Sequence, residues 1–484
     1  MSSSDCSTAS TTPTGRLTQV YAASMNPQAC LVALPNELLV EIAKHLKRKD
    51  LFNLGMVNRS LSNIAMPLIY AEGIDPSMSL KSRAAFACRI DEDPTLAKLV
   101  KKVHFRYAFT KPMKYQRGVG PNGELPGTLV LNEHLTAIHD RATDRELQIL
   151  STSVAAAMWV EELVIEDTSF RAVDEHRTDT MYWAHLVYNG ATALPSWTQP
   201  FSHLKSLKVR FPREVAGWVR LENFLPVIGL PCIEELHLQG FVETQPPQSW
   251  DYKPRSSNVK VLILQGAFLH WQIVSYLVES CKALEYFHYT YTALMSARPG
   301  FNPPGFHPNK NWAPHSWAGI GHALQTQKDS LRGLEILYVV DYVRLARAAV
   351  FHPVYAWQIG TLGSFADFDN LVHLRVPVDA LIPAFIVPGA GSTYLAERLP
   401  VGLETLTMRY DRNTELAELQ CIQSIMAVIA SNKGRKLRRL HLILADDVPF
   451  QKYSIGGCKE ADIQFVITRT RSHWSVGRVV YCTG

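Results

Sequence analysis

Apolar residues recur at helical spacing in the segment from 34 to 70. Leu38 and Ile42 lie four positions apart, as residues on one face of an amphipathic helix do. Asp50 and Asn58 are residue types that cap helix N-termini, and each precedes another run of apolar residues at helical spacing. The pattern therefore predicts three short helices.

This helical segment carries more apolar residues than its own core needs. About 40 residues is near the lower limit for independent folding. Phe52, Met56 and Ile69 exceed what one internal stripe requires, and we expect such residues to contact another protein. The alternative interpretation is a helical hairpin that packs on a larger core of the same chain.

A different pattern begins after residue 80. The six-residue element apolar-x-x-Leu-x-apolar recurs, and the alternation at its end is typical of a short strand with one buried face. Helical patterns such as 270–281 and 415–430 lie between copies, so each unit is predicted as strand, loop and helix. The ten copies begin at Val100, Val160, Leu204, Ile233, Val259, Leu284, Leu334, Leu371, Leu403 and Leu437. A closing strand is predicted around Val479 to Tyr481.

The first segment resembles the F-box. The signature Leu-Pro-x-Glu-(Ile/Leu)-Leu is met by Leu34, Pro35, Glu37, Leu38 and Leu39. The step Asp-Leu-x-x-Leu-x-x-Val is met by Asp50, Leu51, Leu54 and Val57. The ending Pro-Leu-x-Tyr at 67–70 is similar to that of F-box proteins of fungal type.

Residues 95 to 484 resemble a leucine-rich-repeat solenoid with uneven repeat spacing. The expected fold class is α/β: an N-terminal three-helix F-box followed by an irregular leucine-rich-repeat-like solenoid, with parallel strands on the concave face and helices outside. The expected domains are a disordered Ser/Thr-rich tail at 1–30, the F-box at 31–75 and the solenoid at 76–484. The alternative is an α/β sheet protein with longer crossovers.

Composition narrows the class of protein. The chain is 47% hydrophobic and 19% charged with a net charge of +5, as in a globular protein, and this excess does not indicate a nucleic-acid partner. Eight cysteines are scattered without a C-x-x-C pair, which predicts a reducing compartment, cytoplasmic and/or nuclear. Neither a signal peptide nor a membrane-spanning segment is predicted.

The sequence does not predict catalytic chemistry. Gly118, Gly120 and Gly123 match G-x-G-x-x-G, but Pro121 and Asn122 interrupt the motif, and no strand precedes it directly. Zinc-spaced Cys and His of a RING domain are absent from the sequence. We therefore expect no enzymatic activity, no cofactor and no metal.

The F-box resemblance implies a substrate receptor of an SCF (Skp-cullin-F-box) ubiquitin ligase. The F-box would bind the Skp adaptor, and through it a cullin-RING ligase, while the repeats bind a protein substrate for ubiquitination. The alternative is a non-degradative interaction scaffold. The residues expected to bind the adaptor, some of which must instead hold the three helices together, are Leu34, Pro35, Leu38, Ile42, Leu51, Leu54 and Val57.

A substrate surface is predicted from the residues that alternation turns outward on the central strands. Its proposed members are Ile263, Tyr286, His288, Tyr338 and Arg375, with Val261, Ile336 and Val340 extending an apolar centre. Arg375, Arg409 and Arg439 on one flank suit an acidic or phosphorylated partner. In the alternative, the Pro-rich insertion at 291–319 folds over this patch and buries it.

Overall fold

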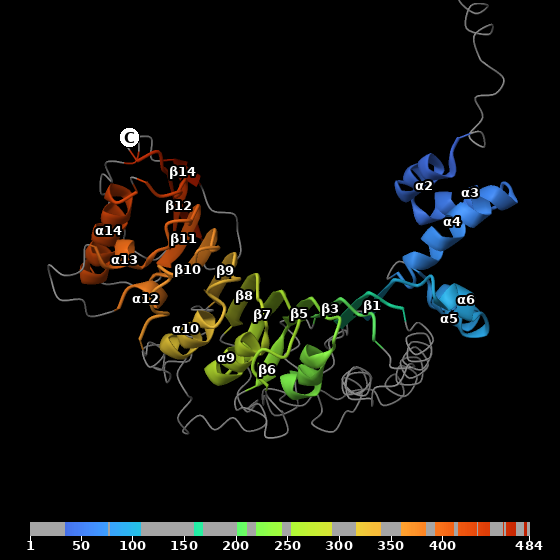
Figure 1. Cartoon of the computed structure of the whole chain (residues 1–484), viewed down its shortest axis with the longest axis horizontal. Coiled ribbons are helices and arrows are strands. Elements are labelled where there is room, and N and C mark those ends of the chain that lie inside the picture. The colour runs from blue at the N-terminus through green and yellow to red at the C-terminus, as the bar shows by residue number, and fades with distance from the viewer. Residues whose placement is uncertain are drawn as a thin grey trace, which may run out of the picture. The chain divides into compact units, whose positions relative to one another are not determined.

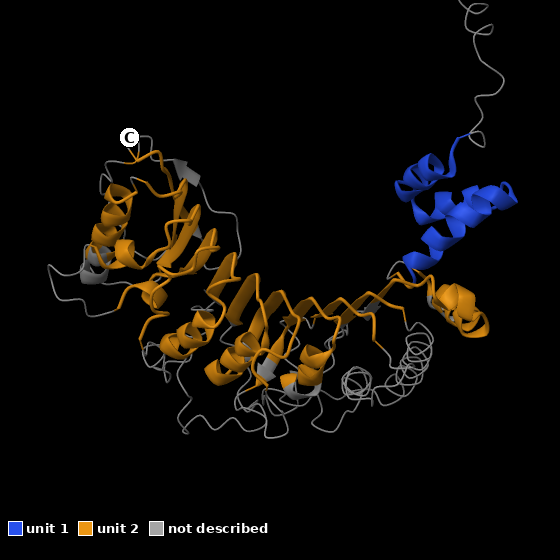
Figure 2. Cartoon of the chain, viewed as in Figure 1, with its two compact units in different colours: residues 1–73 blue, residues 74–484 orange. Residues whose placement is uncertain are grey.

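The computed structural model describes residues 34–75, 78–107, 159–167, 201–210, 219–243, 253–292, 316–339, 360–383, 393–410, 415–432, 434–445, 458, 461–470 and 479–481. The chain divides into two units, Met1–Gly73 and Ile74–Gly484 (Figure 2). The predicted tail at 1–30 and the glycine motif at 118–123 lie outside the described residues.

The first unit contains the three predicted helices, α2 (Asn36–Lys44), α3 (Arg48–Gly55) and α4 (Arg59–Ala71). Asn58 caps α4 as predicted, because its side-chain oxygen accepts a hydrogen bond from the Leu61 amide at 2.8 Å. The expectation for Asp50 is wrong. The Asp50 amide already donates to the Lys47 carbonyl at 2.8 Å, so α3 begins before Asp50 and has no side-chain cap.

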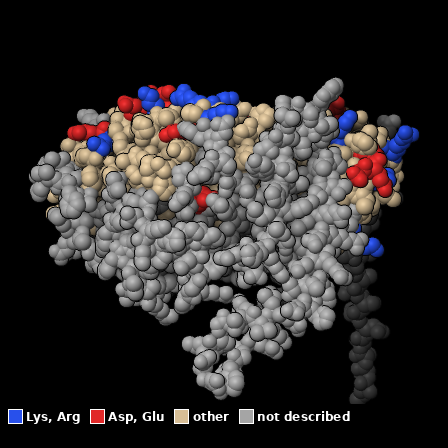
Figure 3. Space-filling view, turned by 90° about the horizontal axis from the view of Figure 1, so that it is seen from below, with Lys and Arg blue, Asp and Glu red and all other residues tan. Residues whose placement is uncertain are grey.

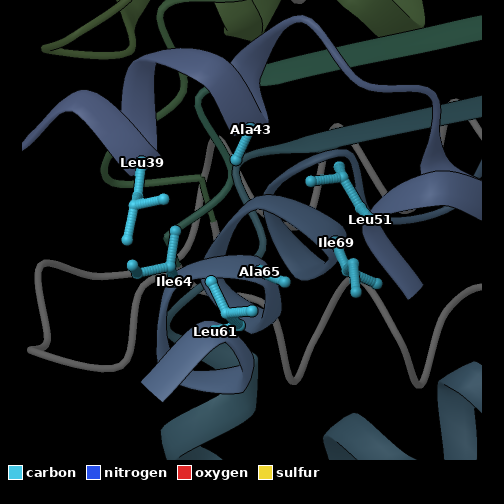
Figure 4. Close-up of a cluster of buried hydrophobic side chains, with 7 residues drawn as sticks. All are labelled: Leu39, Ala43, Leu51, Leu61, Ile64, Ala65 and Ile69. Atoms are coloured by element: carbon cyan, nitrogen blue, oxygen red, sulfur yellow. The ribbon is translucent and has the colours of Figure 1, made fainter. Parts of the chain in front are cut away.

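The three helices share one small apolar core, shown in Figure 4. Its buried members come from all three helices and are Leu39, Ala43, Leu51, Leu61, Ile64, Ala65 and Ile69. Ile69, which we expected to contact a partner, is therefore part of this core. The Arg48 guanidinium donates to the Gly73 carbonyl at 2.7 Å and links the start of α3 to the chain just beyond α4.

The second unit begins with two helices, α5 (Leu80–Glu92) and α6 (Pro94–Ala97). Its strands are β1 (Lys102–Tyr107), β2 (Glu162–Asp167), β3 (Ser206–Arg210), β4 (Val219–Arg220), β5 (Glu235–Gln239), β6 (Phe241–Glu243), β7 (Val261–Leu269), β8 (Tyr286–Thr292), β9 (Gly333–Val339), β10 (His373–Pro377), β11 (Thr405–Tyr410), β12 (Arg439–Ala445), β13 (Gln464–Thr470) and β14 (Val479–Tyr481). Its other helices are η3 (Leu221–Gly229), α9 (Trp271–Ser280), α10 (Trp317–Gln325), α12 (Val378–Leu381), α13 (Tyr394–Arg398) and α14 (Glu415–Ala430).

One sheet organises this unit. Its order is β1-β2-β3-β5-β7-β8-β9-β10-β11-β12-β13-β14, and neighbours are parallel from β1 through β13. Figure 1 shows η3, α9, α10, α13 and α14 on one side of the sheet. We name the opposite side, on which Figure 1 shows no described helix, the open face. The prediction of three short N-terminal helices followed by a parallel α/β unit is confirmed.

Three positions of each repeated element form the core. In the copy that leads into β7 these are Val259, Leu262 and Leu264, each with 0% exposure. They alternate with outward residues, so one side of each strand packs under the helices and the other forms the open face.

For β9 the sequence pattern predicts a repeated element that begins at Leu334, and this start is wrong, because the element begins at Leu331. Leu334 pairs with Phe287 of β8, so it occupies the second apolar position of the element, and the first is Leu331. Both LRGLEI and LEILYV fit the repeated pattern, and only pairing with β8 distinguishes them. As a result Ile336 is fully buried, and Glu335 takes the outward position that the sequence pattern assigned to Ile336.

Buried amide side chains join successive repeats. Gln327, 1% exposed, donates to the Val278 and Cys281 carbonyls and accepts from the Leu284 amide at 2.9 Å. These bonds satisfy backbone groups in the turn between α9 and β8, which would otherwise be buried without partners.

The far end of the sheet was predicted only in part. The closing strand at Val479–Tyr481 is present as β14, and it pairs antiparallel with β13. The strand β13 itself was missed because its segment does not fit the six-residue element, although Phe465 takes the buried position beside Leu440.

Ile74 provides a test of the boundary between the units. It is 1% exposed and bridges Val103 of β1, and its carbonyl accepts from the His104 amide at 2.9 Å. We expect a fragment of residues 74–484 to fold, and a fragment of 76–484 to be less stable by about 2 kcal/mol because it lacks this buried side chain. Urea unfolding of both fragments measures the difference. Equal midpoints would contradict the contribution of Ile74, and loss of structure in both would contradict independent folding of the second unit.

Candidate interaction surfaces

The first unit exposes two apolar stripes. Leu34, Leu38 and Ile42 are 37%, 52% and 43% exposed and form the α2 stripe. Phe52, Met56 and Val57 are 58%, 74% and 66% exposed and form the α3 stripe. Spacing of four residues within each helix places Leu38 with Ile42, and Phe52 with Met56. So many exposed large apolar side chains on so small a unit indicate a surface that binds another protein.

The residues that the sequence predicts to bind the adaptor fall into two groups, exposed and buried. Leu34, Pro35, Leu38, Ile42 and Val57 are exposed. Leu51 is buried in the core that Figure 4 shows, and Leu54 is half-buried against that core. The exposed members can therefore contact a partner, whereas Leu51 holds the helices together.

The open face of the second unit is covered by paired polar side chains over β1 to β5. Lys102 and Lys208 lie 3.0 and 3.1 Å from the Glu162 carboxylate between them. Arg210 donates to Glu166 at 2.7 Å. Figure 3 views the molecule from below, from the side of the helices and not onto the open face, and there too described acidic and basic side chains lie next to one another, mainly along the upper rim of the view. On this part of the open face the carboxylates of Glu162, Glu166 and Glu235 each form an ion pair with at least one cation.

A hydrogen-bonded group occupies the centre of the open face. The Glu335 carboxylate accepts from His288 Nδ1 at 3.1 Å, and Thr290 Oγ1 lies 2.7 Å from His288 Nε2. The hydrogen bond from His288 lowers the pKa of Glu335. Tyr286, half-buried, lies against Gly333, since a Cβ there would come within 2.6 Å of its ring. Burial, and then the nearby Glu335 carboxylate, raises the pKa of Tyr286, so the tyrosine lies within electrostatic reach of Glu335.

The predicted substrate residues are brought together only in part. Ile263, His288 and Glu335 occupy neighbouring outward positions of β7, β8 and β9, and Arg375 follows on β10. The prediction that Ile336 extends this surface is wrong, because its side chain is buried in the core. The side chain of Tyr338, residue Val340 and residues 293–315 of the insertion lie outside the described residues.

In the described ranges, no group of three or more His, Cys, Asp or Glu side chains could hold a metal ion. Among the same residues, no helix is both long enough and apolar enough to cross a bilayer.

The geometry defines the class of protein as a three-helix docking unit joined to a parallel-sheet α/β unit. Residues 31–68 match the F-box domain. The chain therefore contains an F-box domain, and the match spans α2, α3 and most of α4, the helices that carry and support both apolar stripes. No match to a curated protein was found.

The second unit should lose stability in acid through His237. Burial, followed by the charge of Arg210, lowers the pKa of His237 to about 4. The unfolded chain, with a histidine pKa near 6.5, binds this proton first, so stability is unaffected above about pH 6.5 and falls as the pH drops from there toward 4. We expect His237→Gln to reduce this fall, as measured by urea unfolding at several pH values.

A matched substitution is His373→Gln, which changes an exposed histidine of the same face. It should leave the pH dependence unchanged. If His237→Gln and the unaltered chain lose stability in parallel over this pH range, burial of neutral His237 is not a source of the acid sensitivity.

Proposed function

We propose that this protein is the substrate-recognition subunit of an SCF E3 ubiquitin ligase. The F-box domain would bind the Skp adaptor, and the second unit would bind the protein that is ubiquitinated. The observation that supports this most directly is the match of residues 31–68 to the F-box, a domain that typically binds this adaptor. Ligase chemistry would come from the cullin-RING partner, and the chain itself would not be an enzyme.

The α2 and α3 stripes are the adaptor contacts in this proposal. Their side chains are exposed although large and apolar, so docking would remove apolar area from water without disturbing the core. Leu34, Pro35, Leu38, Ile42 and Val57 keep the role predicted for them. Phe52 and Met56 join them, and Leu51 supports the surface from inside.

We further propose that the second unit is an irregular leucine-rich-repeat-like solenoid and that its open face binds substrate. Successive parallel strands joined through helices on one side support this interpretation. The F-box ending of fungal type and a cytoplasmic and/or nuclear location belong to the same proposal. The second candidate function is a scaffold that uses the F-box and repeats without degrading its partner.

The exposed α2 stripe allows a clean test of adaptor binding. We expect a Leu38→Ser and Ile42→Ser double variant to lose most of its capture of a co-expressed Skp adaptor, by at least about tenfold, because both side chains would contact the adaptor and neither is in the core. Affinity capture followed by quantitative blotting measures the adaptor and any cullin recovered with it.

A Leu419→Ser and Met426→Ser double variant is the matched control, because these α14 side chains are 43% and 45% exposed. It should capture the adaptor normally. Equal capture by the α2 variant would refute the adaptor surface. Recovery of a cullin supports the ligase, whereas recovery of the adaptor without a cullin favours the scaffold.

A further inference from the structure

The residues that come just before the strands form a charged edge of the sheet. From β2 to β9 of the main order, the backbone amide of each donates to the carbonyl of its counterpart on the preceding strand, at 2.7 or 2.8 Å. Their charges alternate in sign from each strand to the next. We name this set the charged rim, and its members from β1 to β9 are Lys101, Glu161, Lys205, Glu234, Lys260, Glu285 and Arg332.

Ion pairs connect neighbouring members of the charged rim. The Glu161 carboxylate lies 2.9 Å from the ammonium group of Lys101 on one side and 2.9 Å from that of Lys205 on the other. Lys260 Nζ lies 3.1 Å from the Glu234 carboxylate. Hydrogen bonds from Lys205 and then Lys101 lower the pKa of Glu161, so this carboxylate interacts with both neighbouring strands. The charged rim therefore joins adjacent strands through side chains as well as through the backbone.

Alternation of charge distinguishes the correct neighbour of a strand from the next strand along. The members of the charged rim are exposed or half-buried, and one exposed ion pair changes an equilibrium by a factor of only about 1.4 to 5. A strand that paired with the next but one would bring like charges together, such as Lys101 with Lys205 or Glu161 with Glu234. Omission of one strand would thus replace attraction with repulsion along the edge.

The buried residues distinguish poorly between these strands. The same core position on β2, β3, β5 and β7 is a leucine, at Leu163, Leu207, Leu236 and Leu262. The connections leave the order open as well, since β1 ends at Tyr107 and β2 begins at Glu162, and the entropic cost of closing a loop rises only slowly with its length. Repeated elements of this kind are prone to pair wrongly during folding.

We propose that the charged rim selects the order of the strands while the second unit folds. A strand would pair with a neighbour whose rim residue has the opposite charge, and the strand two places along would be rejected. Val372 precedes β10 and interrupts the alternation after Arg332, so the selection would act on β1 to β9. This inference concerns assembly of the sheet and does not depend on the adaptor or on a substrate.

The test is refolding of the full chain from urea at low and high salt. Glu161→Lys places three lysines in succession on β1, β2 and β3, and a lysine there would be attracted to Glu234 of β5 instead. At about 10 mM salt, where charges act over about 30 Å, we expect its yield of native monomer to be at least about threefold lower than that of the unaltered chain. At about 1 M salt this range falls to about 3 Å, and the two yields should converge. Size-exclusion chromatography with circular dichroism measures the yield.

Two control variants separate order selection from loss of ion pairs and from a change in total charge. Glu161→Gln removes the same ion pairs, but β1 and β3 would still oppose two lysines if they paired, so its yield should be close to that of the unaltered chain. Glu397→Lys makes the same change in charge at an exposed residue of α13 and should also refold normally. Equilibrium urea unfolding checks that each variant is stable once folded, and Glu234→Lys provides a second variant of the charged rim.

Carbodiimide coupling identifies neighbouring strands directly, because it joins a lysine to a carboxylate only when the two are in contact. The native chain should give links from Glu161 to Lys101 and to Lys205. In the misfolded monomer of Glu161→Lys we expect a link between position 161 and Glu234.

Equal yields of Glu161→Lys and the unaltered chain at low salt would overturn the proposal. So would a loss of yield that high salt does not relieve, or an equal loss in Glu161→Gln or Glu397→Lys. A misfolded monomer in which position 161 is not linked to Glu234 would show that the loss has another cause than pairing with the wrong strand, and would also overturn it.

Discussion

Parallel backbone pairing between neighbouring strands is the interaction on which the second unit depends. In the main order each strand from β2 to β13 lies between two others. From β2 to β12 of this order, the residue just before a strand continues the ladder, as where the Glu161 amide donates to Lys101 and the Lys205 amide to Glu161, both at 2.8 Å. Pairing fixes which side chains point under the helices and which form the open face. A shift of one residue would exchange the two sets, so the core and the open face are determined together.

Because strand pairing determines which residues are buried, the sequence could predict only part of the fold. The six-residue element located most strands, because two buried positions separated by one outward residue leave a clear pattern, as at Leu236 and Leu238. It failed at β9, where two overlapping frames fit equally well and the choice depends on Phe287 of the preceding strand. It missed β13, whose buried residues are selected by contact with β12 and do not repeat the element.

For the F-box domain, motif and spacing predicted the helices but not the environment of every apolar residue. Leu38 and Leu39 are adjacent and chemically identical, yet Leu38 is 52% exposed and Leu39 only 4%. Neighbouring residues on a helix point in different directions, so the packing of α2 on α4 buries Leu39 and leaves Leu38 exposed. On α3, likewise, Leu51 is buried and its neighbour Phe52 is exposed. The docking surface could therefore be located on the sequence as a segment, while its individual contacts required the structure.

The apolar stripes and the open face differ in the forces they offer to a partner. The stripes on α2 and α3 offer apolar area, whose burial gives affinity with little dependence on salt. On the open face from β1 to β5, carboxylates and cations already bond one another, so a partner there must replace existing bonds and gains little net energy from doing so.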